Sequence, residues 1–133
     1  MRVLAFYLLL FSQIFAAELE IVINNIKPEK GGNIIFAICE PDKKFPCNKD
    51  NAYKVGKIKV EQSSAKIVFD LPNGVYAVVD GHDENSNNIV DKNMFGIPTE
   101  GYAISGKETS IPKFETAKFD LNKNTQIIMK MKY

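Results

Sequence analysis

The feature that most constrains the fold is a series of short apolar segments separated by turn-forming residues. Leu19, Ile21 and Ile23 occupy alternate positions of a β-branched run, and the same period of two returns between Thr125 and Tyr133. A side-chain period of two is typical of a strand that buries one face. No stretch of the sequence has a convincing helical period. We therefore expect strands at residues 19–24, 33–39, 54–60, 65–71, 75–79, 117–121 and 125–133.

Turn residues separate these expected strands at nearly regular spacing, as at Lys27–Gly32, Pro72–Gly74 and Asn122–Asn124. About seven short strands at such spacing predict an all-β fold, an antiparallel β-sandwich with immunoglobulin-like Greek-key connections. The sequence contains no internal repeat, linker or low-complexity tract, so we expect one domain at residues 18–133.

Residues 1–17 have the pattern of a secretory signal peptide, with a charged start at Met1-Arg2, an apolar core from Val3 to Phe11 and small residues at the end. A membrane anchor is the alternative. However, the apolar run is shorter than the ~20 residues that span a bilayer, and Ser12-Gln13 interrupts it. We expect cleavage after Ala16 or Ala17 and an exported protein, periplasmic or extracellular, with no membrane span once the signal is removed.

Charge and composition exclude several classes of function. The chain has 17 basic and 16 acidic residues, so it lacks the basic field that nucleic acids or anionic membranes attract. Arg2 is the only arginine, which leaves 16 lysines against 16 acidic residues after the expected cleavage. One histidine, two cysteines and no tryptophan exclude a His-rich zinc site and a four-cysteine cluster.

Cys39 and Cys47 bracket a short segment that contains two prolines. In an oxidising compartment an even number of cysteines favours a disulfide. A redox pair would favour Cys-x-x-Cys spacing, which is absent. We therefore predict a structural Cys39–Cys47 disulfide, worth about 2–3 kcal/mol by the chain-entropy relation.

The segment from Asp80 to Asn93 is the most informative for chemistry. Calcium-loop ligands fall at positions one, three, five, seven and nine of a loop, the seventh through its carbonyl oxygen. In this segment those positions are filled by Asp83, Asn85, Asn87, Ile89 and Asp91. Because Ca²⁺ takes six to eight oxygen ligands, the pattern predicts a calcium site, which Asp80, Glu84 or Glu100 would complete.

Two positions depart from the calcium loop of helix–loop–helix proteins. Asn88 replaces the usual glycine, and Met94 replaces the bidentate glutamate. The alternative interpretation is a long hairpin connection, because Asp and Asn are common in turns without any ion. With only two certain carboxylates, the affinity would lie in the weak extracellular range of about 10⁻⁴–10⁻³ M.

Two resemblances support the sandwich. The segment Phe69–Val79 contains a Leu-Pro-x-Gly-x-Tyr strand entry that is similar to that of prealbumin-like domains, with Gly74 in an unusual turn dihedral and the Tyr76 hydroxyl bonded across the corner. The longer pattern resembles domain-of-unknown-function family 2141, an uncharacterised secreted bacterial family. Its motifs here are His82-Asp-Glu-Asn-x-Asn, Asp91-x-Asn-x-x-Gly-Ile-Pro-x-Glu-Gly-Tyr102, Ser105 and Phe114-x-x-Ala117.

This second resemblance implies an exported prealbumin-like β-sandwich, with no established activity to transfer. The sequence departs from the family at Asn88, where glycine is common, and at Ala103-Ile104, where Gly-Phe is usual.

Three functional hypotheses follow. The first is a non-enzymatic accessory or binding module whose Ca²⁺-stabilised loop faces an envelope protein or glycan. The second is a small periplasmic hydrolase that uses His82 with Asp83 or Glu100, although no serine or cysteine nucleophile is evidently paired with the imidazole. The third is a carbohydrate-binding module with Tyr53, Phe95 and Tyr102 as stacking residues, which the absence of tryptophan disfavours.

Overall fold

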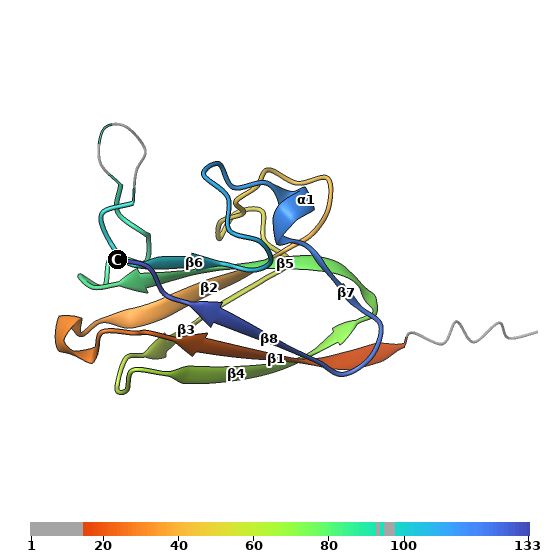
Figure 1. The fold of residues 1–133 in the computed structure, drawn as a ribbon, viewed down its shortest axis with the longest axis horizontal. Coiled ribbons are helices and arrows are strands. Elements are labelled where there is room, and N and C mark those ends of the chain that lie inside the picture. Colours follow the sequence, from red (N-terminus) through yellow and green to blue (C-terminus); the bar gives the residue numbers. More distant parts are fainter. Residues whose placement is uncertain (1–14, 93, 95–97) are drawn as a thin grey trace, which may run out of the picture.

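The computed structural model describes residues 15–92, 94 and 98–133 (Figure 1). Most of the predicted signal peptide, residues 1–14, lies outside the described residues. The elements in chain order are β1 (Ala16–Asn24), the 3₁₀ turn η1 (Pro28–Lys30), β2 (Asn33–Cys39), β3 (Lys54–Lys59), β4 (Ala65–Pro72), β5 (Gly74–Asp83), β6 (Tyr102–Ile104), α1 (Phe114–Ala117), β7 (Phe119–Leu121) and β8 (Thr125–Lys130).

The strands form two packed sheets, which confirms the predicted β-sandwich. One sheet has the order β4-β1-β8, and the other has the order β3-β2-β5-β6, with β7 pairing with β5. All of these pairs are antiparallel except β1 with β8, which is parallel. No helix in the described ranges is long and apolar enough to cross a membrane.

The core lies between the sheets and follows the predicted alternation. Leu19, Ile21 and Ile23 of β1 are fully buried, and Met129 and Met131 reach the core from β8 and the residues after it. Complete burial of one such aliphatic side chain stabilises the fold by roughly 1.5–3 kcal/mol relative to leaving it in water. This core fixes which face of each strand points inward, because a shift of the pairing register by one residue would move the apolar side chains of a strand to the solvent face.

The Tyr76 corner forms as the Leu-Pro-x-Gly-x-Tyr pattern predicts. The Tyr76 hydroxyl donates a 2.7 Å hydrogen bond to the carbonyl of Pro72, and its ring is buried. The predicted unusual dihedral at Gly74 is wrong, since its φ is not among the positive values. Glycine leaves room for the tyrosine there, because a Cβ atom would make a tight contact of 3.3 Å with the Tyr76 hydroxyl.

A Cys39–Cys47 disulfide is present, with Cα atoms 5.6 Å apart, as predicted. Both sulfurs belong to a small second core on the outer face of the five-stranded sheet, together with Ala77 and Ala117. Phe45 and Phe114 pack edge to face across this core, with ring centroids 5.9 Å apart. The disulfide loop and α1 therefore cover one part of that face and leave the rest of it open.

Several elements differ from the prediction. The strand predicted at residues 117–121 is shortened to β7, because Ala117 ends the unexpected helix α1, and β8 ends at Lys130 rather than at residue 133. Strand β5 continues to Asp83, because Asn33 of β2 pairs with Asp83 and the ladder runs from there to Cys39. Strand β6 was not expected, and it forms because Tyr102, Ala103 and Ile104 pair with Gly81, Asp80 and Val79. The acidic loop therefore begins at the end of a long strand and returns to a short edge strand.

Candidate functional site

The Asp/Asn loop, residues 84–99, projects from the end of β5 and returns to β6 (Figure 1). Asp83, the last residue of β5, is completely buried at the base of the loop. Its carboxylate oxygens accept hydrogen bonds from the backbone N–H groups of Asn87 (3.1 Å) and Asn88 (2.7 Å). Asp83 thus bends the first turn of the loop around its own carboxylate.

The turn needs left-handed backbone at two positions. Ser86 has a φ of 57° and Asn88 a φ of 65°. Asparagine tolerates this region better than most residues, since its short polar side chain can bond locally. Asn88 therefore adopts a left-handed backbone at the position where helix–loop–helix calcium loops have glycine.

Asp91 collects the amide side chains of the loop. The side-chain amides of Asn85 and Asn87 each donate a 2.6 Å hydrogen bond to its carboxylate, one to each oxygen. These bonds, first that from Asn87 and then that from Asn85, lower the pKa of Asp91 below its usual value. The predicted residues Asp83, Asn85, Asn87 and Asp91 are thereby joined in one hydrogen-bonded cluster.

Glu100 closes the base of the loop. Its buried carboxylate accepts a 2.6 Å bond from the backbone N–H of Glu84 and a 2.8 Å bond from that of Asp91. One oxygen thus holds the outgoing strand of the loop and the other holds the returning strand. The side chain of Glu84 points elsewhere and lies 3.5 Å from the ammonium of Lys30.

Asp80 is not part of this cluster. It lies an odd number of residues from Asp83 along β5, so the two side chains are on opposite faces of the sheet. Asp80 is buried on the core side with Val78 and His82, and neither of its carboxylate oxygens has a hydrogen-bond partner in the described residues. Burial raises the pKa of Asp80 well above its usual value.

The loop offers carboxylate and amide oxygens, which suit a hard cation that can be bound by few negatively charged ligands. The described residues contain no group of three or more His, Cys, Asp or Glu side chains that could hold a metal ion. The amides of Asn85 and Asn87 do converge on the Asp91 carboxylate, however, and an amide that now donates its N–H presents its oxygen after a half-turn about its terminal bond. Ile89, predicted as a carbonyl ligand, donates its own N–H to Asn87 at 3.2 Å.

His82 is fully buried, and both ring nitrogens have partners. Nε2 lies 2.6 Å from the carbonyl oxygen of Gly31, which can only accept, so Nε2 carries the hydrogen. Nδ1 lies 2.6 Å from the hydroxyl of Tyr133, which also accepts a 2.9 Å bond from the N–H of Lys27. The imidazole is therefore a buried link between Gly31, which follows η1, and Tyr133.

Sequence reasoning missed Tyr133 as the partner of His82, because the two residues are 51 positions apart and no local pattern joins them. Gly101 is a clue in retrospect, since a Cβ atom there would lie 2.5 Å from the Tyr133 ring. Ser105, one of the residues that carry the family resemblance, is also structural. Its hydroxyl oxygen accepts from the N–H of Val78 and donates to the carbonyl of Ala117.

The residues suggested for carbohydrate stacking do not form one platform. Tyr53 packs against Tyr76, whose ring points into the core, with centroids 5.9 Å apart. Tyr102 pairs with Gly81 and lies on the opposite face of the sheet. Phe95 lies outside the described residues.

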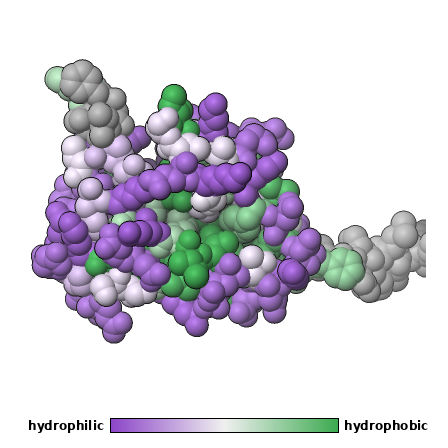
Figure 2. All heavy atoms as spheres, in the orientation of Figure 1, coloured by the Kyte–Doolittle hydropathy of each residue, from purple (hydrophilic) through white to green (hydrophobic). Residues whose placement is uncertain are grey.

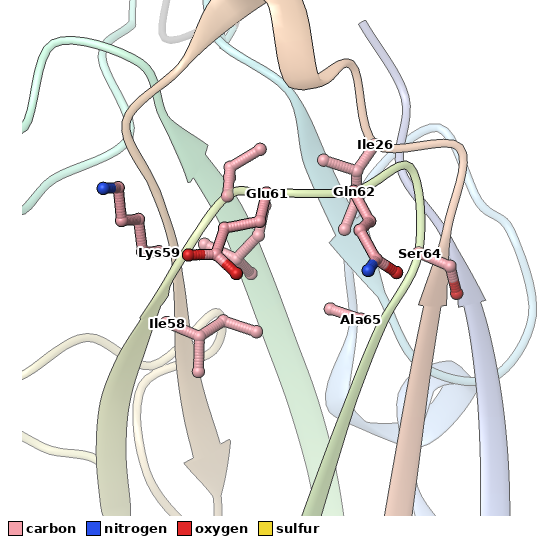
Figure 3. Close-up of a pocket in the computed structure, with 9 residues that line it drawn as sticks. Ile26, Ile58, Lys59, Glu61, Gln62, Ser64 and Ala65 are labelled. Atoms are coloured by element: carbon pink, nitrogen blue, oxygen red, sulfur yellow. The ribbon is translucent and has the colours of Figure 1, made fainter.

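A small pocket of about 130 Å³ lies beneath the turn between β3 and β4 (Figure 3). Ile26, Ile58 and Ala65 form its apolar walls, and Glu61 and Gln62 lie along the chain that crosses it. None of the predicted site residues lines this pocket.

Comparison with known proteins identifies one family. The model of DUF2141, described as an uncharacterized protein conserved in bacteria, matches residues 21–128. No curated protein and no solved structure matches the chain.

Proposed function

The chain belongs to DUF2141, a family of uncharacterized proteins conserved in bacteria, and we propose that it is an exported, non-enzymatic β-sandwich module that binds a partner and carries a Ca²⁺-stabilised loop. The observation that carries the proposal is the convergence of the Asn85 and Asn87 amides on the two oxygens of Asp91. An extended hairpin connection has no need to gather its side chains in this way.

The chemistry of the cluster favours Ca²⁺ over softer ions. Its donors are carboxylate and amide oxygens, which suit Ca²⁺, whereas zinc prefers nitrogen and sulfur ligands. The Asp83 and Asp91 carboxylates and the side-chain oxygens of Asn85 and Asn87 would hold the ion, with the carbonyl of Ile89. Glu100 already holds the base of the loop through two hydrogen bonds. The ion would therefore stabilise mainly the outer half of the loop.

The number of carboxylates sets the expected affinity. Two carboxylates and neutral amides give a dissociation constant in the range of about 10⁻⁴–10⁻³ M, which is characteristic of extracellular modules. The Cys39–Cys47 disulfide supports the same compartment, since disulfides persist where the surroundings are oxidising.

The non-enzymatic role is supported by His82, the residue best suited to acid–base chemistry near neutral pH. Its ring is completely buried, and both nitrogens are held by Gly31 and Tyr133. A general base needs reach to a proton on the substrate, which this arrangement does not give.

Calcium titration with melting as the readout tests the loop. We expect Ca²⁺ at 100 times its dissociation constant to raise the free energy of unfolding by about 2.7 kcal/mol, with little effect of Mg²⁺. Asp91→Asn removes one charge from the cluster while keeping an oxygen, and it should abolish most of the shift. Asp120→Asn, at an exposed position of β7, is the matched control and should respond like the unaltered protein. An equal shift in both variants, or none in the unaltered protein at tens of millimolar Ca²⁺, would contradict the calcium site.

Mass measurement of the protein from a secreting bacterium tests export. We expect the mature chain to begin at Ala17 or Glu18. Cleavage before Glu18 would remove the two pairs that Ala16 and Ala17 make with Pro72 and Leu71, and the ladder from Glu18 onward would remain. Recovery of the intact chain from the cytoplasm would contradict export.

A further inference from the structure

The uncovered part of the five-stranded sheet forms a wide hollow of about 1190 Å³, which we name the outer hollow. Its floor is the outer face of β2, β3, β5 and β6, and three loops stand around it: the disulfide loop, the Asp/Asn loop and residues 106–113. Figure 1 shows the described parts of these loops on the same side of the sheet, and Figure 2 shows that hydrophilic side chains make up much of the surface around them.

The floor of the outer hollow is aliphatic. Ile35, Val79 and Ile104 lie on the outer face and are only partly covered, and Val55 on the neighbouring edge strand is 49% exposed. A Cβ atom at Gly81 would overlap the Val90 side chain, which folds back from the loop onto the floor. Sheet faces that meet only water usually carry polar side chains, so this floor is suited to a covering apolar surface.

Lysines from several segments of the chain line the outer hollow. Lys44 and Lys49 come from the disulfide loop, Lys107 and Lys113 from the loop before α1, and Lys57 and Lys92 from β3 and the Asp/Asn loop. With two more from β8 and its extension, eight of the 16 lysines line it, against only three acidic residues.

Two of those three acidic residues contribute little net negative charge to the hollow. Glu108 forms an ion pair with Lys132, and Asp80 is buried on the core side of β5, where burial raises its pKa. Asp50 is the third. A chain with almost equal numbers of acidic and basic residues therefore gathers positive charge at one place. Within the described residues, Lys44, Lys49, Lys107 and Lys113 take part in none of the ion pairs.

From this juxtaposition we infer that the outer hollow binds an acidic polypeptide segment of a partner protein, with its apolar side chains on the Ile35–Val79–Ile104 floor and its carboxylates at the lysine rim. The inference rests on the proposed partner-binding role and is independent of the calcium ion. Four neighbouring strands span about 14 Å, which is wide enough for one extended strand or one helix.

The distribution of charge favours a peptide over other anions. A single-chain amphiphile carries its charge at one end, whereas eight lysines from several segments line the hollow. An acidic glycan would match the rim, but the aliphatic floor offers few of the stacking rings and hydrogen-bonding groups that sugars use. An acidic peptide supplies both repeated carboxylates and aliphatic side chains.

The test is fluorescence anisotropy with a labelled sixteen-residue peptide of glutamates with leucine at every third position. We expect saturable binding that weakens as salt rises, because exposed charge pairs are screened. The same peptide with serine for leucine should bind more weakly, and with lysine for glutamate it should not bind. Equal or tighter binding of dodecanoate or polygalacturonate at the same lysines would overturn the assignment to a peptide.

Charge-reversal variants locate the site. Lys44→Glu with Lys113→Glu, which changes one lysine of the disulfide loop and one of the loop before α1, should weaken binding at least about tenfold, since each reversal replaces attraction by repulsion. Lys59→Glu with Lys123→Glu changes the net charge equally outside the hollow and should alter the affinity less than about twofold. Equal losses in both pairs would overturn the inference.

A measurement on the unaltered protein covers the case in which a variant unfolds. Amide chemical shifts of Ile35, Val79 and Ile104 should move with added peptide, and those of β1 and β4, which do not line the hollow, should not. Binding is measured in both EDTA and Ca²⁺. Peptide binding without any calcium effect would contradict the calcium site alone, whereas a calcium effect without peptide binding would contradict this inference alone.

Discussion

At the scale of single residues, Asp80 is the group least matched to its surroundings. Its carboxyl group is buried in the sandwich core without a hydrogen-bond partner in the described structure, and burial raises its pKa. The folded state therefore holds the proton more tightly than the unfolded chain does. Stability should fall as pH rises above the unfolded value of 3.8, until the raised pKa of the folded state is passed.

Asp80→Asn should remove this pH dependence, because the amide does not titrate. The free energy of unfolding of the variant relative to the unaltered protein should therefore increase between pH 4 and pH 8, as measured by urea unfolding. Asp70→Asn, an exposed carboxylate on β4, serves as the control. Parallel curves for Asp80→Asn and the unaltered protein would show that burial of Asp80 carries no such cost.

Glu100 is the residue on which the base of the Asp/Asn loop depends. Glu100→Gln keeps one accepting oxygen but turns an amide N–H₂ group toward a backbone N–H, which leaves one buried donor unpaired. We expect a loss of about 1–3 kcal/mol of stability. Amide hydrogen exchange should become faster at Glu84 and Asp91. Glu29→Gln, in the exposed η1 turn, should change neither quantity.

At the scale of elements, the C-terminal residues after β8 fasten both sheets. The N–H of Met131 donates to Asn24, Lys132 exchanges two backbone bonds with Tyr102, and the Tyr133 hydroxyl joins His82 to Lys27. Tyr133→Phe should cost about 1–2 kcal/mol, because the buried Nδ1 of His82 loses its partner. Thermal melting against Tyr53→Phe, at a half-exposed ring, measures this cost. A change no larger than in the control would mean that His82 finds another partner.

The same elements show which parts of the fold are predictable from sequence. Strands β1 and β4 follow from alternation, because each buries one face against the core, whereas β2 follows from a continuous apolar run between turn residues. Strand β6 has only three residues, and its existence depends on the long-range pairing with β5. The same pairing and the β2 ladder extend β5 through Asp83, which no local pattern reveals.

The candidate site likewise contains contacts that the sequence predicts and contacts that it does not. The spacing of Asp83, Asn85, Asn87 and Asp91 predicted residues that do come together, since the contacts lie within one loop. Spacing alone also groups Asp80 with these loop residues, because it does not reveal that β5 continues through Asp83. Once β5 is known to continue, the period of two puts its side chain on the core side. The partners of His82 depend wholly on tertiary structure.

At the scale of the whole molecule, the outer face of the five-stranded sheet is divided between a covered part and the outer hollow. The covered part is the small core of Cys39, Cys47, Ala77 and Ala117, which joins the disulfide loop to α1. Because both of these segments lead into lysine-bearing walls of the hollow, their packing sets how far apart Lys44 and Lys113 stand. The disulfide thus contributes to the shape of the proposed binding surface as well as to stability.

Replacement of both cysteines by serine tests this connection. The variant should lose about 2–3 kcal/mol of stability, as expected for a short loop that is no longer closed in the unfolded chain. At a temperature where it stays folded, it should also bind the acidic peptide more weakly, because the wall that carries Lys44 and Lys49 becomes more mobile. If the folded variant binds the peptide as tightly as the unaltered protein does, the effect on stability and the effect on binding are separate. The disulfide would then serve stability alone, and the shape of the hollow would be set by the sheet and the Phe45–Phe114 contact.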